Sequence, residues 1–321
     1  MPLTIARPSI ETIRAARERI RGLAVRTPLL RVELDGGQIV WLKLENLQPI
    51  GSFKIRGAGS ALGAADPASL GQGVVTASAG NMGQGVAWCA RDLGIPCSVI
   101  VPDHAPATKL AALERLGARV VAVPFAEWWQ VLETRRTDHA DGFFVHPVSE
   151  PAVVAGNATI GLEIAEDLPE VATVLVPFGG GGLSCGIASA LREIRPAART
   201  IAVEPETAAP LTAAMRAGEP VETVYHPSFV DGAGGRSVLP AMWPLAREVL
   251  AGAESVTLEA VAGAVRHLAE RVRVVAEGAG ALGLAAAPRH RGNGGDLVCV
   301  VSGGNIDSTV LRTILAGELP S

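Results

Sequence analysis

Lys54 stands between Phe53 and Ile55 in the stretch "GSFKIRGA", an apolar setting that is unusual for an amine. Partial removal from water disfavours the charged form of an amine, so its pKa falls and a free amine becomes available for Schiff-base chemistry. The alternative is a side chain whose carbon stem covers apolar surface while its ammonium stays in water. Lys54 is therefore a candidate nucleophile, to be weighed with the rest of the chain.

The stretch "TASAGNMGQG" combines a predicted strand end with a helix start. The strand ends in Ser78, Ala79, Gly80 and Asn81. The free N–H groups of a helix N-terminus, together with short polar side chains, suit a carboxylate. An ordinary Ser/Asn cap with a glycine turn is the alternative.

Four consecutive glycines follow the predicted strand "TVLVPF" and open a helix: Gly179, Gly180, Gly181 and Gly182. Bare backbone amides and the helix dipole can converge there on a phosphate. No Lys-Ser/Thr pair follows, so this is not the loop that binds a nucleoside triphosphate. A merely tight turn is the alternative, although such a run of glycines costs chain entropy.

Two further segments end in glycine-rich turns. "LVCVVSGGN" places Ser302 after a predicted strand, and a serine hydroxyl can donate to or accept from a ring nitrogen. "EGAGALG" places Gly278, Gly280 and Gly283 in the GxGxxG spacing of dinucleotide-binding folds. The acidic residue that such folds carry about twenty positions later is replaced here by "SGG", which argues against an NAD-dependent oxidoreductase.

These segments depend on a scaffold of strands and helices. Val/Ile-rich runs alternate with helical patterns, at "GVVTAS", "CSVIVP", "RVVAVP", "FFVHP", "TVLVPF", "TIAVEP" and "DLVCVVS". The alternation predicts an α/β fold of mostly parallel, twisted sheets with helices on both faces. Parallel strands form ligand crevices at their carboxyl ends, where the candidate segments stand. An opening helix is expected after Ser9.

Composition limits the class of partner. The 321 residues are 48% hydrophobic and 19% charged, with a net charge of −4, which indicates a compact enzyme-like chain in two lobes. Basic residues are scattered, so a small molecule is favoured over nucleic acid or membrane. A signal peptide, a long apolar span and CxxC pairs are all missing, so we expect a cytoplasmic protein with reduced thiols at Cys89, Cys97, Cys185 and Cys299.

Taken in order, the four motifs resemble those of the threonine/serine dehydratase family, pyridoxal-phosphate-dependent enzymes of the tryptophan-synthase-β fold type. The resemblance runs from about residue 10 to 317. It implies a homodimer of two-lobed subunits, with a large cofactor-binding domain from residues 1–50 and 150–321. Residues 51–149 would form a smaller inserted domain.

The resemblance also assigns residues. Lys54 would form the Schiff base with pyridoxal phosphate, beside Phe53. Asn81 would contact the ring hydroxyl, and Ser302 would face the pyridine nitrogen. The substrate carboxylate would lie on Ser78, Ala79, Gly80 and Asn81, and the phosphate on Gly179, Gly180, Gly181 and Gly182.

The expected reaction is β-elimination. Once freed by the substrate amine, Lys54 could take the Cα proton while the ring conjugates with the developing charge. A neutral serine such as Ser302 does not keep the ring nitrogen protonated, which favours prompt loss of a β-substituent. Threonine or serine would be dehydrated and deaminated to an oxo acid and ammonia. β-Replacement synthases of this fold differ, because Asp-Arg usually follows their lysine, whereas Ile55, Arg56 and Gly57 follow here.

Other activities of the same fold, and a protein without catalytic activity, remain as alternatives to β-elimination. Racemases of this fold resemble the chain but carry a serine acid/base at the position of Ala79, whose methyl cannot move a proton. A lyase for β-hydroxyaspartate or phenylserine and a non-catalytic pyridoxal-phosphate-binding protein also stay open. Regulatory domains of biosynthetic threonine dehydratases have no counterpart in the sequence, so feedback control is not expected.

The chain departs from the family pattern at several places. Met82 replaces a histidine. Glu204 lacks its second carboxylate, which is replaced by Pro210, so we expect no metal site of the family type. Glu277 matches a family glutamate, with a helix-start cap as an equal interpretation.

A few residues could indicate the size and charge of the substrate. Trp128 and Trp129 are expected ahead of a helix, as core, interface or the wall of a bulky pocket. The segment 226–245 could close over the site, and Arg236 within it could bind a second carboxylate or lie in solvent.

Overall fold

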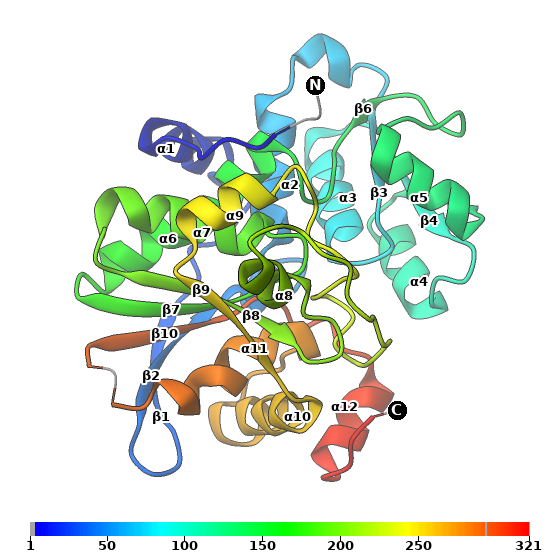
Figure 1. Ribbon diagram of the computed structural model, residues 1–321. Coiled ribbons are helices and arrows are strands. Elements are labelled where there is room, and N and C mark those ends of the chain that lie inside the picture. Colours follow the sequence, from blue (N-terminus) through cyan, green and yellow to red (C-terminus); the bar gives the residue numbers. More distant parts are fainter. Residues whose placement is uncertain (1–3, 293, 321) are drawn as a thin grey trace.

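The computed structural model describes residues 4–292 and 294–320. Their strands form a six-stranded sheet in the order β1-β2-β10-β7-β8-β9 and a four-stranded sheet in the order β5-β4-β3-β6. The two sheets lie in separate lobes, the larger at lower left and the smaller at upper right in Figure 1. The α/β fold with two mostly parallel sheets is as the sequence predicts.

The larger sheet brings together strands from both ends of the chain. Its members are β1 (Leu29–Glu33), β2 (Ile39–Leu44), β7 (Val171–Pro177), β8 (Arg199–Pro205), β9 (Gly252–Val256) and β10 (Asp296–Val301). Only β1 runs antiparallel to its neighbour, and β10 pairs in parallel with both β2 and β7. The smaller sheet is wholly parallel and consists of β3 (Val74–Ala77), β4 (Cys97–Pro102), β5 (Arg119–Val123) and β6 (Phe143–Phe144).

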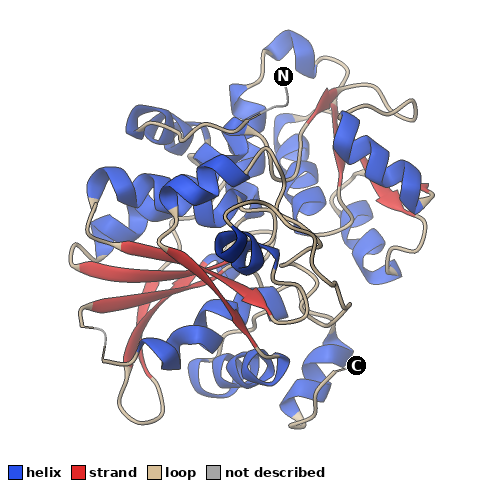
Figure 2. Ribbon diagram, viewed as in Figure 1, coloured by secondary structure: helices blue, strands red, loops and turns tan. Residues whose placement is uncertain are grey.

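Helices cover both faces of the larger sheet because its strands are apolar on both sides (Figure 2). Val298 and Val300 of β10 pack toward one face, and Leu297 and Cys299 toward the other. The first face carries α6 (Pro151–Asp167), α7 (Gly182–Ile194) and, over β8, α9 (Trp243–Val249). The second carries α10 (Leu258–His267), α11 (Gly278–Ala286) and α12 (Ser308–Leu315). Helix α8 (Pro210–Ala217) follows β8.

The smaller sheet packs against α3 (Asn81–Leu93), α4 (Ala107–Arg115) and α5 (Phe125–Thr134). Trp128 and Trp129 lie inside α5 rather than ahead of a helix, which corrects the expectation. Trp128 is half-buried against the core of the smaller lobe, and Trp129 is exposed and donates to Glu133. The two rings contact each other, with centroids 6.3 Å apart.

Helix α2 (Lys54–Ala64) lies between the lobes and packs on both α3 and α6. Glycines allow these contacts at backbone distance. A Cβ on Gly156 of α6 would lie 2.3 Å from the carbonyl oxygen of Arg56, and one on Gly85 of α3 would lie 3.1 Å from that of Lys54. The first turn of α2 is therefore packed from two sides, by α6 at Arg56 and by α3 at Lys54.

All seven strands predicted from the sequence are present, and Ser9 caps α1 (Ile10–Arg19) by accepting the N–H of Thr12 at 3.2 Å. Strands β1, β2 and β9 went unpredicted. The strands of the smaller sheet fall within 51–149, and the exact domain limits stay a prediction. Across the described residues, none of the helices combines the length and apolar character needed to cross a bilayer.

Candidate active site

Lys54 is the first residue of α2, and its side chain is half-buried. Its Nζ donates to the carbonyl oxygen of Pro147 at 3.0 Å and lies 5.2 Å from the centre of the Phe53 ring. Burial lowers the pKa of Lys54 to about 8, although the Glu277 carboxylate acts in the opposite direction. An ordinary lysine has a pKa near 10.4, so Lys54 offers far more free amine at mildly alkaline pH.

The chain contains only three lysines. Lys43 is fully buried in an ion pair with Glu163 at 2.6 Å, and Lys109 pairs with Asp231 at 2.5 Å. In the part of the chain that the structure describes, Lys54 is the lysine that no carboxylate pairs with directly. Its amine is thereby the one best prepared to act as a nucleophile.

The segment before Lys54 runs alongside the end of β10. The N–H of Phe53 donates to the carbonyl oxygen of Ser302 at 3.0 Å, and Ser52 forms an antiparallel bridge with Gly303. Ser302 is 3% exposed, so its hydroxyl faces the interior of the protein. The structure thus brings together the first and fourth candidate segments, which are far apart in the sequence.

Asn81 begins α3 and joins the smaller lobe to this region. Its Nδ2 donates to Glu277 Oε1 at 2.8 Å, and its Oδ1 accepts from Asn305 Nδ2 at 2.7 Å. The N–H of Glu277 donates to the carbonyl oxygen of Gly303 at 3.0 Å. Glu277 occupies the N-cap position of α11, as one interpretation expected, but its side chain makes no capping hydrogen bond to the helix and accepts from Asn81 instead. Asn305 is the last residue of the fourth segment, "LVCVVSGGN", but the sequence assigned it no role.

The loop before Asn81 follows β3. Ser78, Ala79 and Gly80 are half-buried, and the N–H of Gly80 approaches Ser78 Oγ at 3.3 Å. A Cβ on Gly83 would lie 2.2 Å from the carbonyl oxygen of Ser78, so glycine lets the helix fold closely under the loop. Met82 is 1% exposed in the core of the smaller lobe, which gives the residue at the family histidine position a packing role.

The glycine loop follows β7 and leads into α7, and it consists of Gly179, Gly180, Gly181 and Gly182. Gly181 has a φ of +94°, a conformation that favours glycine. A Cβ on Gly180 would lie 2.5 Å from the Val148 side chain. Because Pro147 accepts from Lys54, both the loop and the amine adjoin the turn at residues 147 and 148.

His146 organises that turn and was missed. Its Nδ1 accepts the N–H groups of Val148 at 3.1 Å and of Ser149 at 2.8 Å. Burial lowers the pKa of His146 to about 3, and the nearby charges of Arg135 and Lys54 act in the same direction. A neutral imidazole therefore shapes the backbone that receives Lys54. Its position at the end of the predicted strand "FFVHP" was the available signal.

Glu277 is 8% exposed, and its pKa is raised to about 7. Burial is the main cause, and Asp231 adds to it, while the hydrogen bond from Asn81 and the charges of Lys109 and Lys54 oppose it. The Lys109–Asp231 ion pair links α4 of the smaller lobe to the long segment expected to close over the site. Arg236 in the same segment is exposed.

Glu204 directs its carboxylate to the start of α8. It accepts the N–H groups of Leu211 at 2.9 Å and Thr212 at 2.8 Å, and also the Thr212 hydroxyl at 2.8 Å. Within residues 4–292 and 294–320, no group of three or more His, Cys, Asp or Glu side chains could hold a metal ion. The expectation about a family-type metal site stays a prediction.

The GxGxxG spacing serves packing. Gly278, Gly280 and Gly283 lie within α11, and a Cβ on Gly280 would lie 2.2 Å from the carbonyl oxygen of Gly303. A π-helical turn, Leu268–Val272, and irregular backbone precede this helix, so it lacks the preceding strand of a dinucleotide-binding unit.

Comparison with known proteins agrees with this geometry. The sequence profile of the family described as "Pyridoxal-phosphate dependent enzyme" matches residues 20–303. The chain is 37% identical over 314 residues to the L-threonine ammonia-lyase of Thermotoga maritima, covering 96% of this chain and 78% of that protein.

Solved structures are similar over nearly the whole chain. The threonine deaminase of T.th. has a TM-score of 0.86 and 35% identity, covering 94% of this chain and 99% of that one. Maize serine racemase has a TM-score of 0.86 and 29% identity, covering 97% and 98%. The predicted family and fold type are confirmed: the chain belongs to the family of pyridoxal-phosphate-dependent enzymes.

Proposed function

We propose that this chain is an ammonia-lyase that dehydrates and deaminates a β-hydroxy amino acid, L-threonine or L-serine, to an oxo acid and ammonia. The observation that carries the proposal is Lys54, whose pKa is lowered to about 8 and which lies where the segments of Asn81, Ser302 and the glycine loop come together. Relatives named L-threonine ammonia-lyase, which are lyases, support the same activity.

The residues present fit pyridoxal phosphate. The glycine loop offers bare amides at the N-terminus of α7, where a phosphate is favoured. Among the described residues, Ser52 Oγ is fully buried and without a hydrogen-bond partner, next to the strand end that holds Ser302. A polar ligand there would satisfy such a group. When bound, the cofactor supplies a conjugated ring that accepts charge developing at Cα.

Each of these residues would then have a defined role in the reaction. Lys54 Nζ would hold the cofactor at rest and, as a free amine, would take the proton from Cα of the substrate. The hydrogen bond to Pro147 gives the released amine a fixed position close to the site. The loop of Ser78, Ala79 and Gly80 binds the substrate carboxylate through the start of α3. Ser302, being neutral, would face the ring nitrogen without supplying the charge that keeps it protonated.

The direct test combines a spectrum with product assays. We expect the purified chain, incubated with pyridoxal phosphate, to show a Schiff-base absorbance band. We expect ammonia and oxo acid from threonine or serine at higher kcat/KM than from 3-hydroxyaspartate or phenylserine. A band without ammonia from any of these substrates would identify a non-catalytic binding protein. No band at all would reject the central role of Lys54.

We also propose that the protein is a cytoplasmic homodimer that acts on a free amino acid, without nucleic acid or membrane partners. The evenly distributed charge and the net charge of −4 support a small-molecule partner. Sedimentation of the cofactor-loaded protein at two concentrations tests the dimer. A monomer at both concentrations would contradict it.

Racemisation is the second candidate, because maize serine racemase is structurally similar to the chain. Ala79 has no acid or base to deliver a proton to the opposite face of Cα. We expect wild type to release ammonia from L-serine faster than it forms D-serine. Ala79→Ser should raise the share of D-serine among the products at least about tenfold, because a positioned acid or base typically contributes that much or more to the rate. Chiral chromatography measures both; racemisation that outpaces ammonia in wild type would refute the argument.

A further inference from the structure

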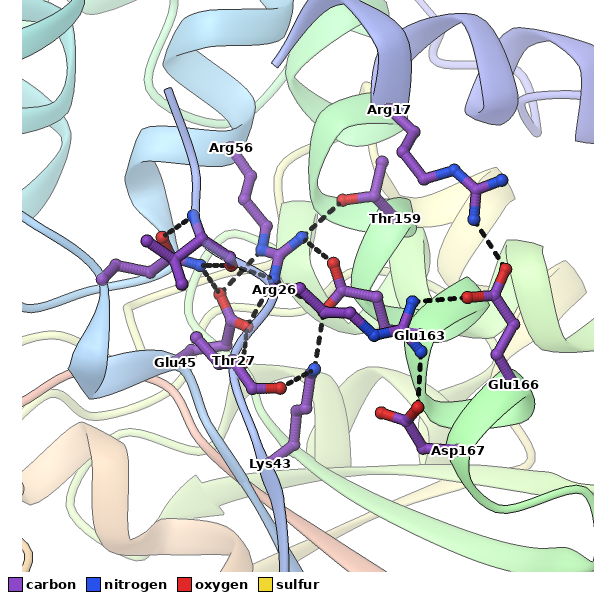
Figure 3. A network of polar contacts seen from close by, with 12 residues as sticks. Arg17, Arg26, Thr27, Lys43, Glu45, Arg56, Thr159, Glu163, Glu166 and Asp167 are labelled. Carbon is purple, nitrogen blue, oxygen red and sulfur yellow. Dashed lines mark hydrogen bonds and ion pairs between the residues drawn. The ribbon is translucent and has the colours of Figure 1, made fainter. Parts of the chain in front are cut away.

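Two residues after Lys54, a buried network of charges surrounds Arg56 (Figure 3). Arg56 is 1% exposed, Lys43 and Glu45 are 0% exposed, and Glu163 is 4% exposed. These four come from α2, from β2 and the turn after it, and from α6. The network therefore ties the helix of Lys54 to two elements of the larger lobe.

Arg56 uses every side of its guanidinium. Its Nε and Nη2 each donate to the Glu45 carboxylate at 2.8 Å. Its Nη1 and Nη2 donate to Glu163 at 2.7 and 2.9 Å, Nη1 also donates to Thr159 at 3.1 Å, and Nη2 to the carbonyl oxygen of Val25 at 3.1 Å. Such a planar fork fixes direction as well as distance.

The partners are fixed in turn. Glu45 accepts from the Thr27 hydroxyl at 2.6 Å, and Glu163 accepts from Lys43 at 2.6 Å. Two positive and two negative side chains balance, so no charge of this network is left unpaired. Buried ion pairs of this kind add little net stability but select one arrangement over others, as a buried polar group does when it fixes register.

Helix geometry connects this network to Lys54. Successive helical residues are rotated by about 100°, so side chains two positions apart point to nearly opposite sides. A guanidinium held on one side of α2 therefore directs Lys54 to the other side. The close packing of α2 on α6, through Gly57 and Gly156, sets the distance between these helices but leaves rotation of α2 about its axis to the side chains.

We propose that Arg56 is a positioning residue for Lys54: the paired carboxylates of Glu45 and Glu163 hold α2 in the rotation that aims the Lys54 amine at its site. This inference rests on the proposed function, in which Lys54 forms the Schiff base. It adds a role for Arg56, which touches neither substrate nor cofactor and acts through the helix.

Three variants test the proposal in the full chain. Arg56→Lys keeps the charge but loses the fork. Arg56→Met/Glu45→Gln removes one charge of each sign and leaves the Lys43–Glu163 pair intact, so no buried charge is stranded. The matched control, Arg26→Met, removes ion pairs to Glu166 and Asp167 that lie on the exposed side of α6. Circular dichroism and urea unfolding identify which variants fold.

The readout is the rate at which pyridoxal phosphate attaches to the cofactor-free protein, measured through the growth of its absorbance band. The rate is measured at pH values from about 6 to 10, a range that brackets the lowered pKa of Lys54. We expect the Arg56 variants to attach the cofactor at least about tenfold more slowly, within the range that a misplacement of about 1 Å produces. Attachment requires the unprotonated amine, so the rate should rise with pH around the pKa of Lys54. We expect the midpoint of this rate profile to move upward from about pH 8 in the Arg56 variants, because a loosened Lys54 is better solvated. The Arg26 control should match wild type.

A purely structural role predicts lower stability without a shifted midpoint. The proposal is overturned if either folded Arg56 variant attaches the cofactor with the rate and midpoint of wild type. If wild type attaches the cofactor normally, that result leaves the proposed function intact. If wild type itself forms no band, the proposed function and this inference fail together.

Discussion

Lys54→Ala is expected to lose the Schiff-base band and to release ammonia from threonine at least about a thousandfold more slowly than wild type. A positioned acid or base alone contributes about 10²- to 10⁴-fold, and this variant loses the covalent attachment as well. Absorbance of the purified variant and a coupled ammonia assay measure the two effects. Bound cofactor without a band would separate binding from attachment.

The small number of lysines makes attachment simple to map. Borohydride reduction followed by peptide mass spectrometry should place the cofactor on the peptide with Lys54 and on neither of the other two lysines. The control is Lys109→Arg, which keeps the charge opposite Asp231 and should retain the band. Label on Lys109 or Lys43 in native protein would contradict the assignment.

Glu277→Gln is expected to flatten the pH dependence of stability. Glutamate in the unfolded chain titrates near 4.5, whereas burial raises the pKa of Glu277 to about 7. Between these values the folded protein binds a proton that the unfolded chain does not, so the free energy of unfolding falls as pH rises from 4.5 to about 7. At about 1.36 kcal/mol per pKa unit, the wild type loses on the order of 3 kcal/mol, which the variant should keep.

Urea unfolding of the cofactor-free proteins at about pH 5 and about pH 8, on either side of most of this titration, measures the difference. The variant should be similar to wild type at the lower pH and more stable than wild type at the higher pH. Asp231→Asn is the matched control, because Asp231 raises the pKa of Glu277 and its removal should reduce the effect without abolishing it. Equal pH slopes for wild type and Glu277→Gln would show that Glu277 is already ionised in the folded protein.

The sequence predicted the strands and the meeting of their carboxyl ends. Continuous Val/Ile runs have few alternatives to a buried parallel strand, so all seven runs became strands. The same rule explains why the segments of Asn81 and Ser302 lie near Lys54 in space. Strand β1 and its pairing with β2 were not predicted, because "LLRVE" is partly exposed and lacks a continuous Val/Ile run.

The partners of individual side chains could not be predicted. Arg56 is visible in the motif, but its carboxylates lie 11 and 107 positions away, and sequence spacing gives no sign of either contact. Glu277 does begin α11, but the hydrogen bond that its side chain accepts from Asn81, 196 positions away, had no signal in the sequence. The GxGxxG spacing is ambiguous by itself, because close helix packing and phosphate binding both require glycine; the missing acidic residue had already argued against a dinucleotide site.

The pairing of β2 with β10 bears on how the chain folds during synthesis. Trp41 of β2 lies opposite Val298 of β10, so the larger sheet cannot close until almost all residues have been made. The smaller sheet uses residues 74–144 only and can form early. Contacts of long sequence separation slow folding, so the larger lobe should be the late, chaperone-dependent step, with the edge of β2 exposed until β10 arrives.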